Sequence, residues 1–164
     1  MRGISPSRIE IGAVLETGRE LALRDPVAVP DFDGYTFPEP ALVDVRIRRV
    51  GRGAEVAGSI DATARGTCVR CLEDAAVHLE LDLLERLEPG DSVTRDPLDD
   101  SNVLEGTSLD LGDLVRQLID SALPLALTCD ASCAGLCDQC GRRRPSPEHP
   151  DPNVCRCPPS VEET

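Results

Sequence analysis

Hydrophobic and polar residues alternate along three consecutive stretches in the middle of the chain, 42–50, 55–66 and 75–87. Alternation with a period of two places apolar side chains on one face of a strand and polar side chains on the other. The apolar faces are formed by Val43, Val45, Ile47, Val56, Gly58, Ile60, Ala62, Ala64, Val77, Leu79, Leu81 and Leu83. Three such stretches in succession predict an antiparallel β meander with one face exposed to water.

A helical pattern follows in residues 109–123. The apolar residues of this segment recur every three or four positions and would share one side of a helix: Leu111, Leu114, Val115, Leu118, Ile119 and Ala122. Asp110 is placed to act as the N-cap, and Pro124 ends the pattern. Because the apolar side of this helix needs a surface to cover, we predict an α+β fold in which one main helix covers the meander.

The segments on either side of the meander carry no long pattern. Residues 9–37 contain only short strand-like pieces, and their prolines and those just beyond argue against helix there: Pro26, Pro30, Pro38 and Pro40. Residues 88–108 combine proline and glycine with several acidic residues, which predicts a mobile acidic loop.

These patterns divide the chain into three parts. We predict a sheet-and-helix domain over 1–127 that includes the acidic loop, a Cys-rich zinc-binding segment over 128–157, and a disordered tail over 158–164. Residues 142–160 contain six prolines and no apolar pattern, so this stretch cannot form a core of its own. We therefore expect the C-terminal part to be ordered only by a bound metal ion or a partner.

The charge balance is strongly acidic, because 17 Lys and Arg residues oppose 30 Asp and Glu residues for a net charge of -13. Such a surface repels phosphate backbones and anionic membranes, which argues against broad nucleic-acid binding and against a membrane partner. It favours a basic protein partner, although a charge of this size also serves solubility alone.

The chain carries no apolar run as long as a signal peptide or a membrane-spanning helix, so we predict a cytoplasmic protein. Structural disulfides are rare in the reducing cytoplasm. The eight cysteines of the chain therefore point toward metal binding. Eight thiols are enough for one or two four-thiolate zinc sites.

The strongest cysteine motif is Cys137-Asp-Gln-Cys140-Gly141. Two thiols at this spacing lie on one side of a tight turn, and the glycine after them lets the backbone fold back, as in a zinc knuckle. We predict that Cys155 and Cys157 complete this site, with His149 as a competing ligand.

The remaining cysteines are Cys68, Cys71, Cys129 and Cys133. The first two lie at the tip of the hairpin that joins the second and third alternating stretches, and the other two follow the helix. If the helix runs antiparallel across the hairpin, its end meets the tip and a second tetrahedral site closes. A redox couple is the alternative, but a redox Cys-x-x-Cys usually opens a helix in a βαβ unit, whereas strands flank this one.

Little in the sequence supports catalysis. The only histidines are His78 and His149, and His78 lies on the polar face of a strand, as expected of an exposed surface residue. No glycine-rich phosphate loop and no nucleophile with an evident base is present. A zinc ion held by four thiolates has no open position and is structural. We predict that the protein is not an enzyme.

Several motifs occur in an order that resembles the YceD family of large ribosomal RNA subunit accumulation proteins. They are Gly-Thr-Cys68-Val-Arg-Cys71-Leu, Leu109-Asp-Leu-Gly-Asp-Leu-Val, Leu123-Pro-Leu, and Cys129-x3-Cys133-Ala-Gly-Leu-Cys137-x2-Cys140-Gly. The resemblance covers residues 12–141, and Cys155-x-Cys157 is similar to members with a closing Cys-x-Cys. It implies a small bacterial cytoplasmic factor of ribosome biogenesis.

The partner implied by this resemblance is a ribosomal or assembly protein of the large subunit, since such proteins are typically basic and the chain is acidic. A compact basic segment, Arg142, Arg143 and Arg144, is the exception, and it offers a contact for ribosomal RNA or is simply a solvated turn. Two other functions remain open at this point: a thiol redox or zinc-buffering protein, and a structural protein–protein adaptor outside ribosome assembly.

Overall fold

The computed structural model describes residues 8–89, 102–104 and 106–144. Its elements are β1 (Arg8–Glu10), α1 (Gly12–Thr17), β2 (Leu21–Val27), β3 (Ala41–Val50), β4 (Gly53–Thr67), β5 (Asp74–Pro89), β6 (Asn102–Leu104), β7 (Ser108–Asp110) and α2 (Leu111–Ala122). The chain forms two compact units. Unit 1 comprises Met1–Ala64 and His78–Leu123, and unit 2 comprises Arg65–Val77 and Pro124–Thr164.

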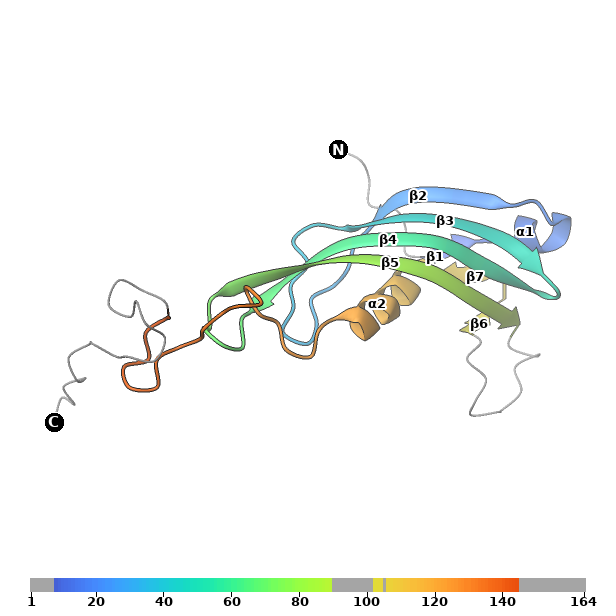
Figure 1. The fold of residues 1–164 in the computed structure, drawn as a ribbon. Helices are drawn as coiled ribbons and strands as arrows, with labels where there is room; N and C mark the ends of the chain where they lie inside the picture. Colours follow the sequence, from blue (N-terminus) through green and yellow to red (C-terminus); the bar gives the residue numbers. More distant parts are fainter. Residues whose placement is uncertain (1–7, 90–101, 105, 145–164) are drawn as a thin grey trace. The chain divides into compact units, whose positions relative to one another are not determined.

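A five-stranded sheet in the order β2-β3-β4-β5-β6 forms the framework of unit 1 (Figure 1). Strands β2 and β3 pair antiparallel, as do β3 and β4, whereas β5 and β6 pair parallel. A second, two-stranded antiparallel sheet is made by β1 and β7. The prediction of an α+β fold built on antiparallel strands is confirmed.

The alternating pattern identifies the buried face of the sheet. In β3, Val43, Val45 and Ile47 are buried while the residues between them are exposed. In β5, Leu79 and Leu83 are buried, but the inward residues between and beside them are only half-buried. The polar face of β5 includes His78, which is exposed as predicted. Alternation therefore indicates which face a side chain takes but not how completely that face is covered.

The N-terminal segment is more regular than its sequence predicts. It contains the short helix α1, which precedes the first of the prolines and ends at Gly18 in the left-handed conformation, with φ 71°. It also contains β2, in which Pro26 pairs with Leu42. Because β2 is an edge strand of the sheet, the missing N–H of Pro26 is tolerated.

The interval predicted as an acidic loop, 88–108, contains regular structure at both ends. Strand β5 continues to Pro89, β6 occupies Asn102–Leu104 and pairs with the end of β5, and β7 begins at Ser108. Residues 90–101 and residue 105 lie outside the described residues, and with them most of the acidic side chains of this interval.

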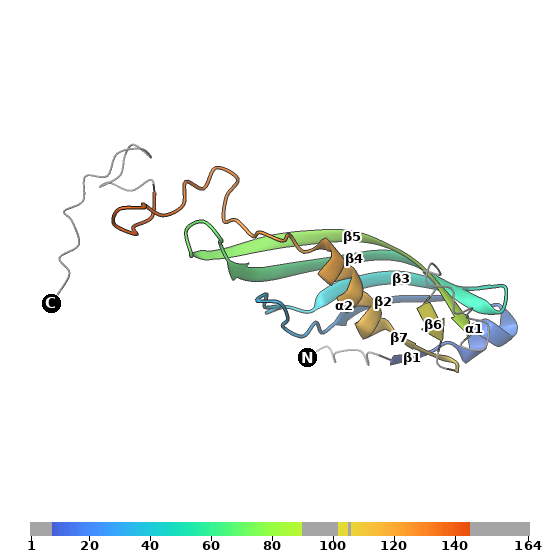
Figure 2. The same ribbon diagram turned by 90° about the horizontal axis from the view of Figure 1, so that it is seen from below.

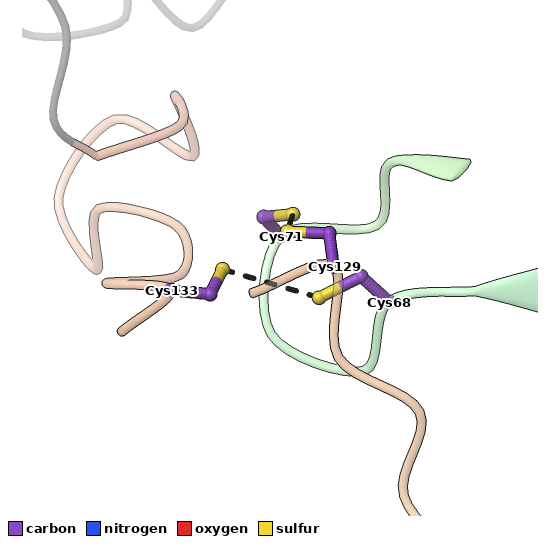
Figure 3. Close-up of side chains that lie close together, drawn as sticks. All are labelled: Cys68, Cys71, Cys129 and Cys133. Carbon is purple, nitrogen blue, oxygen red and sulfur yellow. Dashed lines mark hydrogen bonds between the residues drawn. The ribbon is translucent and has the colours of Figure 1, made fainter. Parts of the chain in front are cut away.

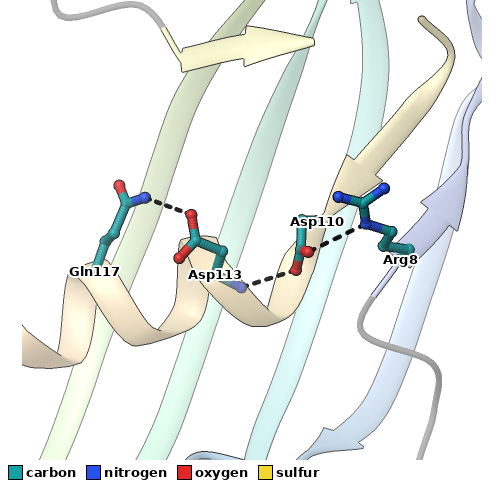
Figure 4. A network of polar contacts seen from close by, with 4 residues as sticks. All are labelled: Arg8, Asp110, Asp113 and Gln117. Atoms are coloured by element: carbon teal, nitrogen blue, oxygen red, sulfur yellow. Dashed lines mark hydrogen bonds and ion pairs between the residues drawn. The ribbon is translucent and has the colours of Figure 1, made fainter. Parts of the chain in front are cut away.

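Helix α2 begins directly after β7 and buries Leu111, Leu114, Val115 and Ile119, while polar residues take its other side. Its N-cap is Asp110, whose Oδ1 accepts a hydrogen bond from the Asp113 N–H at 3.0 Å (Figure 4). The second carboxylate oxygen of Asp110 lies 3.4 Å from Arg8 Nε in β1. Both ribbon views place α2 on one face of the five-stranded sheet (Figure 1 and Figure 2). The shorter helix α1 contacts β3.

Gly58 in β4 leaves no room for a side chain. A Cβ atom on Gly58 would lie 2.0 Å from the carbonyl oxygen of Asp44 in the neighbouring strand. No real side chain is accommodated at that distance, so the close approach of the two backbones requires glycine.

None of the helices in the described part of the chain is long and apolar enough to cross a membrane.

Candidate metal centre

The first thiol pair lies on the turn that joins β4 to β5, in unit 2. The Cys68 N–H donates to the Glu73 carbonyl at 2.8 Å, and the Leu72 N–H donates to the Cys68 carbonyl at 2.9 Å. Leu72 takes a positive φ of 63°, which is uncommon for a residue other than glycine. This tight turn buries both thiols, with Cys68 0% and Cys71 3% exposed.

The chain after α2 brings the second thiol pair to this turn through backbone hydrogen bonds. The Val69 N–H donates to the Leu127 carbonyl at 2.9 Å, and the Leu136 N–H donates to the Arg70 carbonyl at 3.1 Å. The Arg70 guanidinium also donates to the Cys133 carbonyl at 3.1 Å. The two ends of the segment that carries Cys129 and Cys133 are thereby fixed against the turn.

Four sulfurs meet as a result: Cys68, Cys71, Cys129 and Cys133 (Figure 3). All four lie within 4.8 Å of one another. The Sγ atoms of Cys71 and Cys129 are 3.5 Å apart, and those of Cys68 and Cys133 are 3.9 Å apart. Sulfurs bound at about 2.3 Å to a tetrahedral zinc ion lie about 3.8 Å from each other. The donor set and its spacing therefore fit a four-thiolate zinc site, and these cysteines are free thiols.

The ionisation of these thiols is uneven. Burial raises the pKa of Cys68, but hydrogen bonds from backbone groups of Cys129, Cys71 and Arg70 outweigh it and lower the pKa to about 6. Hydrogen bonds with the Cys71 and Cys133 thiols, with burial in addition, raise the pKa of Cys129 to about 12. Crowded thiols resist joint ionisation because their negative charges repel, and a divalent cation would supply the compensating charge.

The predicted knuckle around Cys137 and Cys140 has the expected backbone turn. The Gly141 N–H donates to the Cys137 carbonyl at 2.8 Å, with Gly141 at a φ of 70°. The Cys137 N–H donates to the Arg142 carbonyl at 2.8 Å. The chain thus folds back directly after the second thiol, as the glycine predicts.

The ligands predicted to complete that knuckle, Cys155 and Cys157, lie outside the described residues, as does the competing ligand His149. The grouping of all four as one site therefore stays a prediction. Within the described residues, the four-thiol group that comes together is the one on the hairpin tip and the segment after α2.

Two arginines near the thiols were not anticipated as their partners. Arg144 Nη2 lies 3.2 Å from Cys137 Sγ and 2.7 Å from Asp138 Oδ1, and the hydrogen bond with Cys137 raises the pKa of Arg144. Arg143 Nη2 lies 3.7 Å from Cys129 Sγ. The sequence feature that could have indicated these contacts is the run of arginines immediately after Cys140-Gly141. The turn at Gly141 directs these arginines back toward the sulfurs.

This placement changes the picture of the basic segment. Arg142 and Arg143 are exposed, as a solvated or RNA-facing segment requires, but the side chain of Arg144 is only 17% exposed and is engaged with Cys137 and Asp138. Arg144 therefore supports the knuckle turn, and the exposed residues of the basic segment are Arg142 and Arg143.

The fold and the thiol group define an α+β protein with a candidate four-cysteine metal centre. The chain belongs to the YceD family, described as large ribosomal RNA subunit accumulation protein YceD, whose sequence profile matches residues 56–157. The matched span contains all eight cysteines. The resemblance found in the motifs is confirmed.

Relatives occur in mycobacteria. The chain is 30% identical over 145 residues to the uncharacterized protein Rv2926c of Mycobacterium tuberculosis, a match covering 84% of this chain and 70% of the relative. The same values hold for the uncharacterized protein Mb2951c of Mycobacterium bovis. The uncharacterized protein ML1660 of Mycobacterium leprae is 30% identical over 105 residues, covering 62% of this chain and 48% of the relative. No solved structure matches the chain.

Proposed function

We propose that this chain is a non-enzymatic factor of ribosome biogenesis that supports the accumulation or processing of large-subunit ribosomal RNA. The observation that carries the proposal is membership of the YceD family, whose description names large ribosomal RNA subunit accumulation. The family description names the biological process, and the residues of this chain suggest how the protein takes part in it.

Within this role, unit 2 holds a structural zinc ion through Cys68, Cys71, Cys129 and Cys133. The support is the burial of Cys68 and Cys71 and the sulfur separations of 3.5 Å and 3.9 Å, which fit a tetrahedral ion. Four thiolates leave no open position on the metal, so its contribution is to fix the hairpin tip to the segment after α2.

A second zinc ion bound by Cys137, Cys140, Cys155 and Cys157, or with His149 in place of one cysteine, is part of the same proposal. Its support is the closed turn around Cys137 and the knuckle spacing. The two sites together would account for all eight thiols of the chain.

The proposed partner is a basic ribosomal or assembly protein of the large subunit. A net charge of -13 attracts such a protein from a distance and repels free RNA. Arg142 and Arg143 offer a local exception at which ribosomal RNA can approach.

The decisive experiment is sedimentation of ribosomes from a strain that lacks this protein. We expect a deficit of mature large subunits and an excess of their precursors, both restored by the unaltered chain. If the double variant Cys68→Ser with Cys71→Ser does not restore the normal profile, the role depends on the thiol centre. A normal profile in the deletion strain would contradict the proposed function.

Thiol redox chemistry is the second candidate function, favoured by the lowered pKa of Cys68, about 6, beside other free thiols. Titration of thiol reactivity in the protein as purified distinguishes the two. A zinc-loaded centre leaves the four clustered thiols slow to react until a chelator is added. A redox centre reacts at once and contains no metal.

A further inference from the structure

A separate group of metal-ligating side chains lies on the exposed face of β4 and β5, within unit 1. It consists of Asp61, His78 and Glu80, and one ligand atom from each lies within 4.8 Å of the other two. His78 Nε2 is 3.5 Å from Asp61 Oδ2 and 3.5 Å from Glu80 Oε1. All three residues are exposed, so the group is open to solvent.

These distances fit a shared cation better than direct hydrogen bonds. An N–H···O bond has its heavy atoms about 2.7–3.2 Å apart, and Nε2 carries at most one proton to share between two carboxylates. Two N or O donors that each lie about 2.1 Å from a tetrahedral ion are about 3.4 Å apart. The spacing around Nε2 is therefore longer than a direct hydrogen bond and compatible with ligands arranged about an ion.

The surroundings of the imidazole are consistent with this arrangement. Thr63 Oγ1 lies 3.5 Å from Nδ1, the nitrogen that faces away from the carboxylates, and is placed to orient the ring. A surface hollow of about 420 Å³ borders the group and is lined in part by Asp61, Glu80 and Asp82. Space for water molecules on an ion is thus present beside the three ligands.

We propose that Asp61, His78 and Glu80 form a second kind of metal site. It binds a divalent transition-metal cation such as zinc or manganese through one nitrogen and two oxygens. Three protein ligands leave at least one coordination position for water or for an oxygen of a bound partner. The site differs from the thiol centre in its hard ligands, its exposure and its exchangeable position, and it does not depend on the proposed function.

The test uses the full-length protein with its thiol sites loaded with stoichiometric zinc and all excess zinc removed. Mn²⁺ is the probe. Mn²⁺ competes poorly for thiolates, because they favour softer ions, and it broadens the NMR signals of nearby nuclei. The chain has two histidines, so the ring signals of His78 and His149 serve as an internal comparison. We expect small amounts of Mn²⁺ to broaden the His78 ring signals selectively.

Variants define the ligands. Asp61→Asn and Glu80→Gln each remove one ligand charge and should weaken Mn²⁺ binding by about tenfold or more. Asp120→Asn makes the same change of charge at an exposed position of α2 and should leave the affinity within about twofold. Equal broadening of both histidines, or an equal loss of affinity in Asp120→Asn, would mean that the acidic chain only attracts cations diffusely, and would overturn the proposal.

Discussion

Replacing a single cysteine is enough to test the candidate metal centre. Cys133→Ser replaces a thiol by a hydroxyl, which does not supply the thiolate that a zinc ion prefers in such a site. We expect the variant to bind one zinc ion fewer per chain than the unaltered protein, measured by elemental analysis after purification under reducing conditions.

The matched control is Ala134→Ser, which places the same hydroxyl on the next, exposed residue. It should keep the full zinc content. If Cys133→Ser retains as much zinc as Ala134→Ser, Cys133 is not a ligand and the four-thiol grouping is wrong.

Backbone proximity at Gly58 gives a second prediction on the scale of one residue. Gly58→Ala would place a methyl group 2.0 Å from the Asp44 carbonyl oxygen, so β3 and β4 would have to separate. We expect the free energy of unfolding to fall by about 1–3 kcal/mol, measured by urea denaturation.

The comparison for this prediction is Gly12→Ala at the start of α1. A methyl group there meets its nearest atom, Thr107 Cβ, at an ordinary 3.5 Å, and alanine favours helix. Stability should be unchanged or slightly higher. Equal losses in both variants would contradict the requirement for glycine at position 58.

Helix α2 offers a prediction on the scale of an element. Asp110→Ala removes the N-cap acceptor of the Asp113 N–H and should lower the free energy of unfolding by about 1 kcal/mol. Asp110→Asn keeps an acceptor at the cap and loses only the exposed ion pair with Arg8, so it should cost less. Thermal or urea unfolding measures both, and an equal loss in Asp110→Asn would assign the effect to the lost charge rather than to the cap hydrogen bond.

Elements with a strong local pattern could be predicted from the sequence, and elements that depend on a distant partner could not. The strands β3, β4 and β5 follow from alternation alone. Strand β1 has only three residues and pairs with β7, so that Arg8 and Asp110 meet across 102 positions of sequence. No local pattern encodes such a pairing.

The candidate site divides in the same way. Each pair of cysteines is recognisable from its spacing, because two thiols on one turn is a local property. Which pairs meet depends on backbone hydrogen bonds between residues far apart, such as Val69 with Leu127. The sequence also suggested that the hairpin-tip pair meets the pair after the helix, and the described fold brings these four thiols together. The partners predicted for the Cys137 knuckle lie outside the described residues.

On the scale of the whole molecule, the net charge should govern association with the proposed basic partner. Replacing Asp96, Asp99 and Asp100 by Lys changes the net charge from -13 to -7. These residues lie outside the described residues, in the acidic interval after β5. We expect weaker co-sedimentation with large-subunit precursors, and weaker binding of the unaltered protein as salt rises, because charges are screened beyond about 8 Å at physiological ionic strength.

The control reverses the exposed residues Glu16, Glu20 and Glu39 instead, for the same net charge. Equal weakening in both variants would assign the effect to overall charge, and greater weakening in the first would assign it to the acidic interval. Binding that is insensitive to salt would contradict the basic-protein partner.

The division of unit 2 into two distant parts of the chain has a consequence for the order of events during synthesis. Cys71 is translated 58 residues before Cys129, which at roughly 5–20 residues per second is about 3–12 s. The last residue of unit 1, Leu123, also precedes Cys129. The early thiols therefore leave the ribosome without their partners, and the centre closes only after every residue of unit 1 has been made.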